Sequence, residues 1–148
     1  MRYLNEIAVN RALLASVLSW FIAQVMKVVF TAMITKKWNF GRMLGLGGMP
    51  SSHAATVCGL STAVGRLCGF YSVEFAICCM FSLVVMTDAA GVRRAAGKQA
   101  ALLNTIVQEM FNDGIVVTYE RLKELLGHTP FEVLIGALLG ILIGFIVA

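Results

Sequence analysis

Two histidines are present in this chain of 148 residues, and each lies beside a proline that marks a predicted helix start. His53 closes the run Met49-Pro50-Ser51-Ser52-His53, and His128 opens the run His128-Thr129-Pro130. Imidazole can act as a nucleophile or exchange a proton near neutral pH. A single histidine near a membrane interface is usually a polar anchor, but two at helix starts among several cations favour a catalytic or binding site.

The segment before His53 has the residue types of an anion-binding site. Gly47 and Gly48 let the backbone approach a ligand closely. Ser51 and Ser52 stand at the start of a predicted helix, where N–H groups point outward and the helix dipole favours an anion. The same residues also suit an ordinary helix cap, because proline and serine are common at helix starts for local reasons.

Glu132 follows His128 by four residues. If a helix starts there, its carboxylate lies near one imidazole nitrogen, where it fixes the tautomer and raises the basicity of the other nitrogen. Alternatively, Glu132 only stabilises the helix N-terminus, which is a common role for an acid in the first turn.

Charged residues within or beside apolar segments give a third signal. Asp88 lies in the last turns of an apolar segment, and at that depth it needs a partner, for which Lys27, Arg93 and Arg94 are the candidates. The two arginines also suit bidentate contact with phosphate oxygens. They could instead be a solvated pair that ends a span, and Lys27 could extend outward to the interface. We expect a buried ion-pair cluster beside the histidines.

The elements that must position these side chains are membrane helices. Apolar residues make up 59% of the chain and charged residues 14%, and the mean hydropathy is +0.83, values that exclude an ordinary soluble domain. A spanning helix needs about 20 apolar residues. The sequence predicts a single all-α domain over 1–148, with spans at about 9–35, 51–70, 73–90 and 131–148 and an amphipathic interfacial segment at 98–127.

Four spans place both termini on one membrane face and both histidines on the other. The histidine face carries more cations, so the positive-inside bias makes it the cytoplasmic face of the cell membrane. Its cations are Lys36, Lys37, Arg42, Arg93, Arg94, Lys98, Arg121 and Lys123, against Arg2, Arg11 and Arg66 on the other face. In the last span, a stripe of Gly136, Gly140 and Gly144 predicts close packing within the chain or, alternatively, a homo-oligomer seam.

Other partners are not indicated by the sequence. No basic run interleaves with aromatic residues, so nucleic acid is not an expected partner. The cysteines lie in or beside apolar segments without metal-ligand spacing, so neither a metal site nor a disulfide framework is predicted; they are Cys58, Cys68, Cys78 and Cys79. The net charge of +4 suits anionic lipid headgroups or phosphate.

Three motifs together resemble the divergent branch of the type 2 phosphatidic acid phosphatase superfamily, which includes lipid phosphatases and vanadium haloperoxidases. They are residues 47–54 (GGMPSSHA), 88–97 (DAAGVRRAAG) and 125–133 (LLGHTPFEV). The resemblance covers nearly the whole chain, and the combination of three motifs is specific.

The resemblance implies roles for individual positions. His128 matches the nucleophile, with Glu132 where the superfamily has aspartate, and His53 matches the general acid. Ser51 matches a phosphate contact, while Ser52 replaces a glycine. The superfamily's first motif, a lysine and an Arg-Pro pair, has no regularly spaced counterpart; Lys27, Lys36 and Arg42 are the candidate substitutes. Its arginine before the last histidine is also displaced, so Arg93 or Arg94 is expected to supply that charge.

The activity implied is hydrolysis of a lipid-borne phosphomonoester or diphosphate through a phosphohistidine, without a metal or other cofactor. The irregular first motif leaves a different class open: a non-catalytic membrane protein that binds or moves an anionic lipid with an inherited phosphate pocket. A packing scaffold without a ligand is a third reading, but it leaves both histidines and the buried cations unexplained.

Overall fold

The computed structural model describes residues 2–36, 48–110 and 127–148. All regular structure in these ranges is helical, as predicted. The helices are α1 (Arg2–Ala8), α2 (Arg11–Thr35), α3 (Ser52–Cys68), α4 (Val73–Thr87), a π-helical turn η2 (Asp88–Val92), α5 (Arg93–Met110) and α6 (Pro130–Val147). The predicted positions Lys37, Arg42, Gly47, Arg121 and Lys123 lie outside the described residues.

Local capping chemistry sets where the long helices begin. The side chains of Asn10, Ser51, Ser72 and Thr129 each accept a hydrogen bond from a backbone N–H three residues later, at the starts of α2, α3, α4 and α6. Such caps satisfy N–H groups that have no partner within the helix. The predicted spans therefore begin within two residues of the observed helices.

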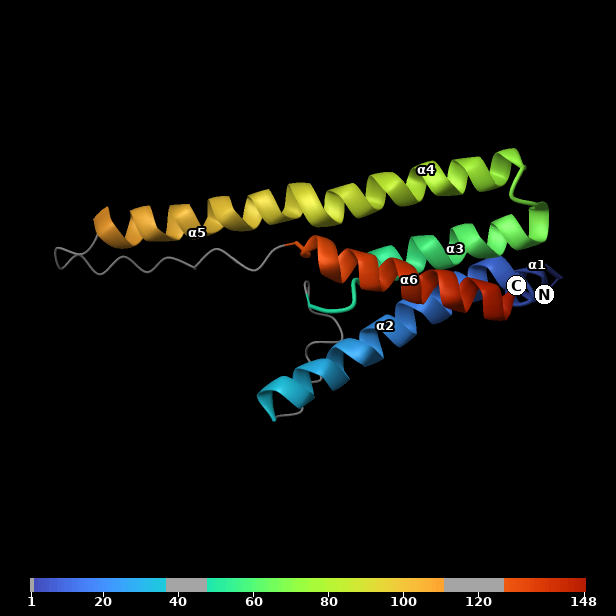
Figure 1. Cartoon of the computed structure of the whole chain (residues 1–148), viewed down its shortest axis with the longest axis horizontal. Helices are drawn as coiled ribbons and strands as arrows, with labels where there is room; N and C mark the ends of the chain where they lie inside the picture. Colours follow the sequence, from blue (N-terminus) through green and yellow to red (C-terminus); the bar gives the residue numbers. More distant parts are fainter. Residues whose placement is uncertain (1, 37–47, 111–126) are drawn as a thin grey trace.

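Helix α3 lies at the centre of the bundle, with α2, α4 and α6 packed against it (Figure 1). Figure 1 shows that α2 and α4 run toward the end of the bundle where α3 and α6 begin, so α3 and α6 are parallel. Both chain termini lie together at the opposite end. Two helix N-termini, which carry His53 and His128, therefore meet at one end of the bundle.

The glycine stripe of α6 allows this parallel pair to pack closely. A Cβ atom at Gly136 would collide with the backbone of Ser51, and one at Gly144 would lie 2.6 Å from Cβ of Thr62. Gly140 is equally close to the backbone of Ala55. The stripe is thus used within the chain, the first of the two predicted alternatives, and a homo-oligomer would have to form through a different surface.

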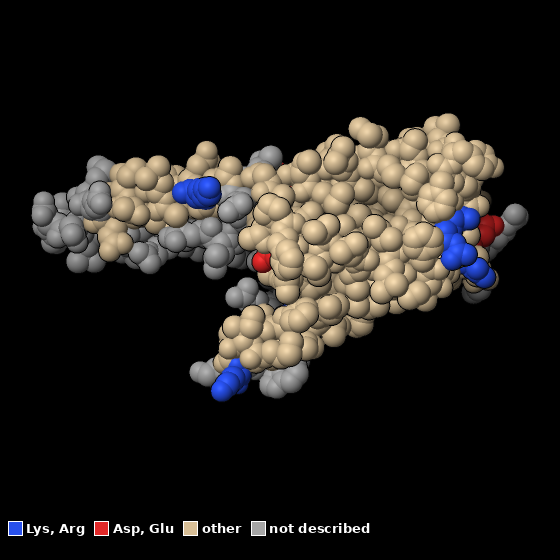
Figure 2. All heavy atoms as spheres, in the orientation of Figure 1, with Lys and Arg blue, Asp and Glu red and all other residues tan. Residues whose placement is uncertain are grey.

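The described helices are those of an all-α membrane bundle. Three are long and apolar enough to cross a membrane: α2, the continuous helix Val73–Gln108 and α6. The 17 residues of α3 lie among them. On the face seen in Figure 2, a broad uncharged surface separates the charged side chains at the end that holds the termini from those on the other half of the molecule. An uncharged surface of this kind suits the hydrocarbon core of a bilayer.

The helix that contains the third predicted span continues past residue 90. Helix α4 continues through η2 into α5, because no proline interrupts residues 73–110 and the π-helical turn keeps the backbone hydrogen-bonded. One side of α5 is buried at Ala100 and Asn104, while Leu102 and Leu103 on another side are exposed. Residues 98–110 are therefore continuous with α4 in one helix, and residues 111–126 lie outside the described ranges. The interfacial position of this segment stays a prediction.

Candidate active site

The rings of His53 and His128 meet edge to face, with their centroids 5.9 Å apart and their planes at 63°. His53 is the second residue of α3 and is half-buried, whereas His128 immediately precedes the cap of α6 and is only 3% exposed. The two imidazoles, far apart in the sequence, therefore share one site at the end of the bundle where the two helices begin.

Backbone hydrogen bonds hold this site together. The Ser51 amide donates to the carbonyl oxygen of Glu132 at 3.0 Å, which joins the start of α3 to the first turn of α6. The His128 amide donates to the carbonyl oxygen of Ala89 at 2.9 Å, which ties the start of α6 to η2. Gly127, just before His128, has a φ of +92°, a backbone conformation that suits glycine.

Glu132 has two roles at the start of α6. One carboxylate oxygen lies 3.3 Å from Nδ1 of His128, the predicted contact, and the same oxygen accepts a hydrogen bond from the Thr129 amide at 2.9 Å. Thr129 in turn accepts from the Glu132 amide, which completes a capping box. The functional and the purely local readings of Glu132 are therefore compatible. With Nδ1 facing the carboxylate, Nε2 is the nitrogen suited to attack a ligand.

Lys27 points inward. Its side chain is 3% exposed, and Nζ donates a hydrogen bond to Oγ of Ser52 at 3.2 Å, within the first turn of α3. Gly48, with a φ of +92°, lies beside its aliphatic part. Gln24, one turn earlier on α2, is also buried, and its side-chain oxygen has no hydrogen-bond partner among the described residues. These side chains form a buried polar face on α2, which places an ammonium group beside the candidate site.

Ser51 has the structural role that its position allowed. It is fully buried, and its hydroxyl oxygen accepts a hydrogen bond from the Ala54 amide. Its own amide donates to the carbonyl oxygen of Glu132. A direct contact between Ser51 and phosphate stays a prediction. Ser52 is the serine whose hydroxyl faces the lysine.

The other predicted residues are placed only in part. Asp88 is half-buried and opens η2, one residue before the Ala89 carbonyl that receives the His128 amide. Arg93 and Arg94 open α5, but their side chains lie outside the described part of the structure, as do Arg42 and Gly47. Within the described residues, no group of three or more His, Cys, Asp or Glu side chains is placed to hold a metal ion.

Comparison with known proteins shows the family of this chain. The profile of the Divergent PAP2 family matches residues 8–143, a range that includes both histidines, α2 to α5 and most of α6. The chain belongs to the Divergent PAP2 family. It is 39% identical over 154 aligned residues to the Bacillus subtilis (strain 168) membrane protein YuiD, with 97% of each chain covered. No solved structure matches.

Family membership makes this chain a membrane protein related to phosphatases. Two backbone contacts at the site could not be predicted from residue types alone. The carbonyl of Ala89 fixes the backbone of His128, and Gly136 allows Ser51 to reach α6. Both contacts are made by backbone atoms, so residue types do not indicate them. The position of Ala89 in the motif at 88–97 is the one signal that could have indicated the first contact.

Proposed function

We propose that this protein is a membrane-embedded phosphatase that hydrolyses a lipid-borne phosphomonoester or diphosphate through a phosphohistidine on His128. The observation that carries the proposal is the shared site: two imidazoles in edge contact, one of them backed by a carboxylate, with a buried ammonium nearby. A polar anchor role would not require His128 to be buried, or Lys27 to turn inward on an apolar helix.

The reaction divides into two balanced steps. In the first, Nε2 of His128 forms a bond to phosphorus as the bond from phosphorus to the lipid oxygen breaks, and protonated His53 gives its proton to the departing alkoxide. In the second, water attacks the phosphohistidine, neutral His53 accepts a proton from that water, and the P–N bond breaks to release inorganic phosphate. Glu132 stabilises the positive charge that develops on His128.

Two groups among the described residues supply positive charge that can stabilise the negatively charged phosphoryl oxygens. The Lys27 ammonium lies at the first turn of α3, and the N-terminal ends of α3 and α6 converge on the same site. Each helix N-terminus carries a partial positive charge of about half an elementary charge. Preorganised positive charge of this kind is usually the largest contribution to phosphoryl transfer. We assign Arg42, Arg93 and Arg94 to the same task.

The ring separation defines one requirement of the mechanism. A nucleophile lies about 3–3.5 Å from the atom it attacks and a general acid about 2.6–3.2 Å from the leaving oxygen, so a phosphoryl group needs more room than edge-to-face contact allows. His53 is half-buried and His128 is enclosed and held by Glu132. His53 is therefore the ring that swings aside when a phosphoryl group binds between them.

Among the described residues, more cations belong to the end of the bundle that holds the site (Lys27, Lys36, Arg93, Arg94 and Lys98) than to the other end (Arg2, Arg11 and Arg66). Arg66 donates to the Phe145 carbonyl oxygen at the end that holds the termini, whereas Lys36 and the site belong to the opposite end. On the positive-inside bias, we propose that the active face is cytoplasmic. The substrate phosphate would be presented from the cytoplasmic leaflet of the cell membrane.

The contact between the rings also favours one rival function, in which the chain binds or moves an anionic lipid without hydrolysing it. In that case the phosphate would rest on Lys27 and the helix ends without passing between the imidazoles.

Purified full-length protein, assayed for phosphate release from phospholipid and polyprenyl phosphates, separates the two functions. Phosphate release that depends on His128 supports the phosphatase function. So does radiolabelled phosphate that is trapped on the protein in an acid-labile linkage, as expected for a phosphohistidine. Saturable binding of the same lipids without release in every case supports the rival.

A further inference from the structure

A cleft of about 360 Å³ opens beside the candidate site between α2 and α4. Its floor is the first part of α3, including Ser52, His53 and Thr56, and its walls include Trp20 from α2 and Phe81 and Val85 from α4. Within the described helices, α2 and α4 both pack on α3 but not extensively on each other, which leaves this gap. The cleft therefore has a polar end at the site and apolar walls along the membrane.

The walls of the cleft continue into surface that faces hydrocarbon. Trp20 is 40% exposed and Phe81 is 54% exposed, and both lie on helices long and apolar enough to cross a membrane. A bilayer lipid can therefore reach the cleft from the side. Its volume lies at the lower end of the range of about 300–1,000 Å³ found for small-molecule sites, which suits part of one hydrocarbon chain and not a whole lipid.

The direction of phosphoryl transfer connects this cleft to the reaction. In an in-line displacement, the leaving oxygen departs on the side of phosphorus opposite the nucleophile. With His128 as nucleophile and His53 as acid, the lipid oxygen lies at His53. The carbon chain attached to that oxygen must leave the site past His53, and His53 lines the cleft.

We propose that the cleft between α2 and α4 holds the hydrocarbon chain of the lipid phosphate, and that the substrate reaches the site laterally from the bilayer past His53. This inference rests on the proposed phosphatase function and names its substrate class: a phosphomonoester of a long-chain alcohol or lipid, with the chain on the His53 side.

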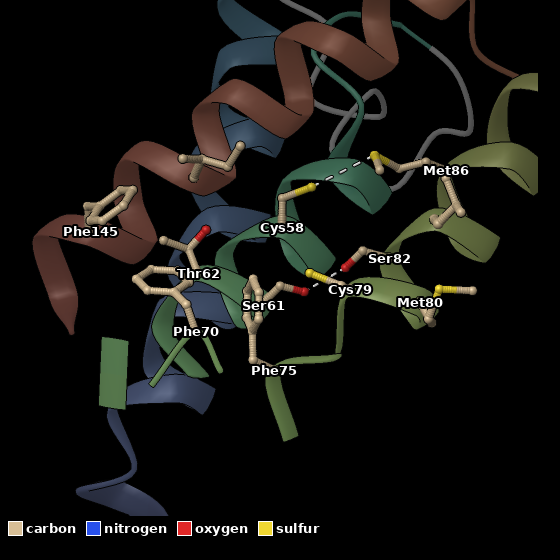
Figure 3. Close-up of a pocket in the computed structure, with 12 residues that line it drawn as sticks. Cys58, Ser61, Thr62, Phe70, Phe75, Cys79, Met80, Ser82, Met86 and Phe145 are labelled. Atoms are coloured by element: carbon tan, nitrogen blue, oxygen red, sulfur yellow. Dashed lines mark hydrogen bonds between the residues drawn. The ribbon is translucent and has the colours of Figure 1, made fainter. Parts of the chain in front are cut away.

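A second, larger cavity of about 530 Å³ provides a control site for tests of the α2–α4 cleft (Figure 3). It lies between α3, α4 and α6 and is lined by neither histidine. Its buried polar pair is already satisfied, because the hydroxyls of Ser61 and Ser82 lie 2.7 Å apart and Ser82 also donates to the Val57 carbonyl oxygen. Figure 3 shows Cys58 and Met86 at one end and Phe145 at the other. A chain seated there would not lead from His53.

The first test compares two substrates that differ only in chain length, hexadecyl phosphate and butyl phosphate. Val85→Trp fills the α2–α4 cleft, and Leu83→Trp places the same bulk in the larger cavity. We expect Val85→Trp to lower the ratio of kcat/KM for hexadecyl over butyl phosphate by about tenfold or more, and Leu83→Trp to leave the ratio as in the parent. An unchanged ratio in Val85→Trp, or an equal fall in both variants, overturns the proposal.

The second test does not depend on turnover or on the folding of a bulky variant. In Trp38→Phe protein, Trp20 is the one remaining tryptophan of the chain and lies in the cleft wall. A hexadecyl phosphonate brominated along its chain should quench Trp20 fluorescence saturably in nanodiscs. Brominated hexadecane should quench it only in proportion to its concentration in the bilayer, without saturation. Saturable quenching without any phosphatase activity would support the hydrocarbon-chain site and contradict the proposed phosphatase function. Phosphatase activity without saturable quenching would support the phosphatase function and contradict the hydrocarbon-chain site.

Discussion

The amide of Ser51 donates a hydrogen bond to the carbonyl oxygen of Glu132 at 3.0 Å, so the start of α3 is joined directly to the first turn of α6. Gly136, one turn further along α6, touches the backbone of Ser51. His53 follows two residues after one partner, and His128 precedes the other by four. The spacing of the imidazoles therefore depends on a backbone contact that involves neither ring.

Gly136→Ala should separate the two helix starts. The added Cβ would collide with the Ser51 backbone, and overpacking of this kind costs about 1–3 kcal/mol of unfolding free energy. Gly91→Ala is the matched control, because a Cβ there would meet no atom within 4 Å. The melting temperature in detergent and the phosphate release per folded molecule should both be lower than in the parent for Gly136→Ala. Both should be unchanged for Gly91→Ala. Equal melting temperatures would show that the contact does not hold the site together.

Glu132→Gln should separate the two roles of this side chain. Glutamine can still complete the capping box, so the melting temperature should stay close to that of the parent. It carries no charge and no longer stabilises the imidazolium of His128, and a comparable carboxylate-to-amide change behind a catalytic histidine lowers kcat by about 10⁴-fold. We expect a loss of phosphate release of about tenfold or more at unchanged stability.

Thr129→Ala is the complementary variant, because it weakens the helix cap and keeps the Glu132 carboxylate. It removes the hydroxyl that accepts from the Glu132 amide, and loss of such a cap costs about 0.5–2 kcal/mol of stability. The carboxylate next to His128 remains, so activity per folded molecule should be close to that of the parent. If both variants changed stability and activity in parallel, Glu132 would be a cap alone.

The two histidines should respond differently to removal. His128→Ala removes the nucleophile and should leave almost no turnover of any substrate. His53→Ala removes general acid assistance, which is typically worth about 10² to 10⁴-fold, and the loss should shrink for p-nitrophenyl phosphate because its leaving group needs little protonation. Phosphate release from this ester and from a lipid phosphate gives the comparison. An equal loss on both substrates would remove His53 from the acid role.

The parts of the structure that could be predicted are those decided by local chemistry. Ser51 and Thr129 are side chains that cap helices, so the starts of α3 and α6 follow from the sequence. The approach of Glu132 to His128 follows from four residues of helical spacing. The inward face of α2 follows from a lysine and a glutamine placed one turn apart in an apolar segment.

The remaining features depend on tertiary packing, which local patterns do not contain. The 5.9 Å separation of His53 and His128 arises because α3 and α6 are parallel and joined through backbone atoms, and the sequence indicated only a shared membrane face. The continuation of α4 into α5 does not follow from the sequence pattern, because Arg93 and Arg94 are typical of the end of a span, whereas a helix without a proline can continue past them. The cleft beside His53 exists because α2 and α4 diverge around α3.

Membrane orientation can be measured with two single cysteines in a chain whose four native cysteines are replaced by alanine. Tyr71→Cys lies at the end that holds the termini, where Tyr71 is 94% exposed, and Lys36→Cys lies at the opposite end, beyond Lys27 on α2. With the site on the cytoplasmic face, an impermeant thiol reagent should label the first in intact cells and the second only after lysis. The reverse pattern would place the active site outside.

Lys27→Met should lower activity much more than stability. Methionine keeps an unbranched side chain of similar length at this buried position, so most of the packing around it is retained. If the ammonium binds phosphate oxygens, its loss should lower kcat by about 10² to 10³-fold, as for removal of one preorganised donor. Lys98→Met, at an exposed position on α5, is the control and should alter neither quantity. Because Lys27 contacts Ser52 at the start of α3, a purely structural lysine would lose stability and activity together. Phosphate release and melting temperature measured on the same preparations therefore distinguish a binding group from a packing group.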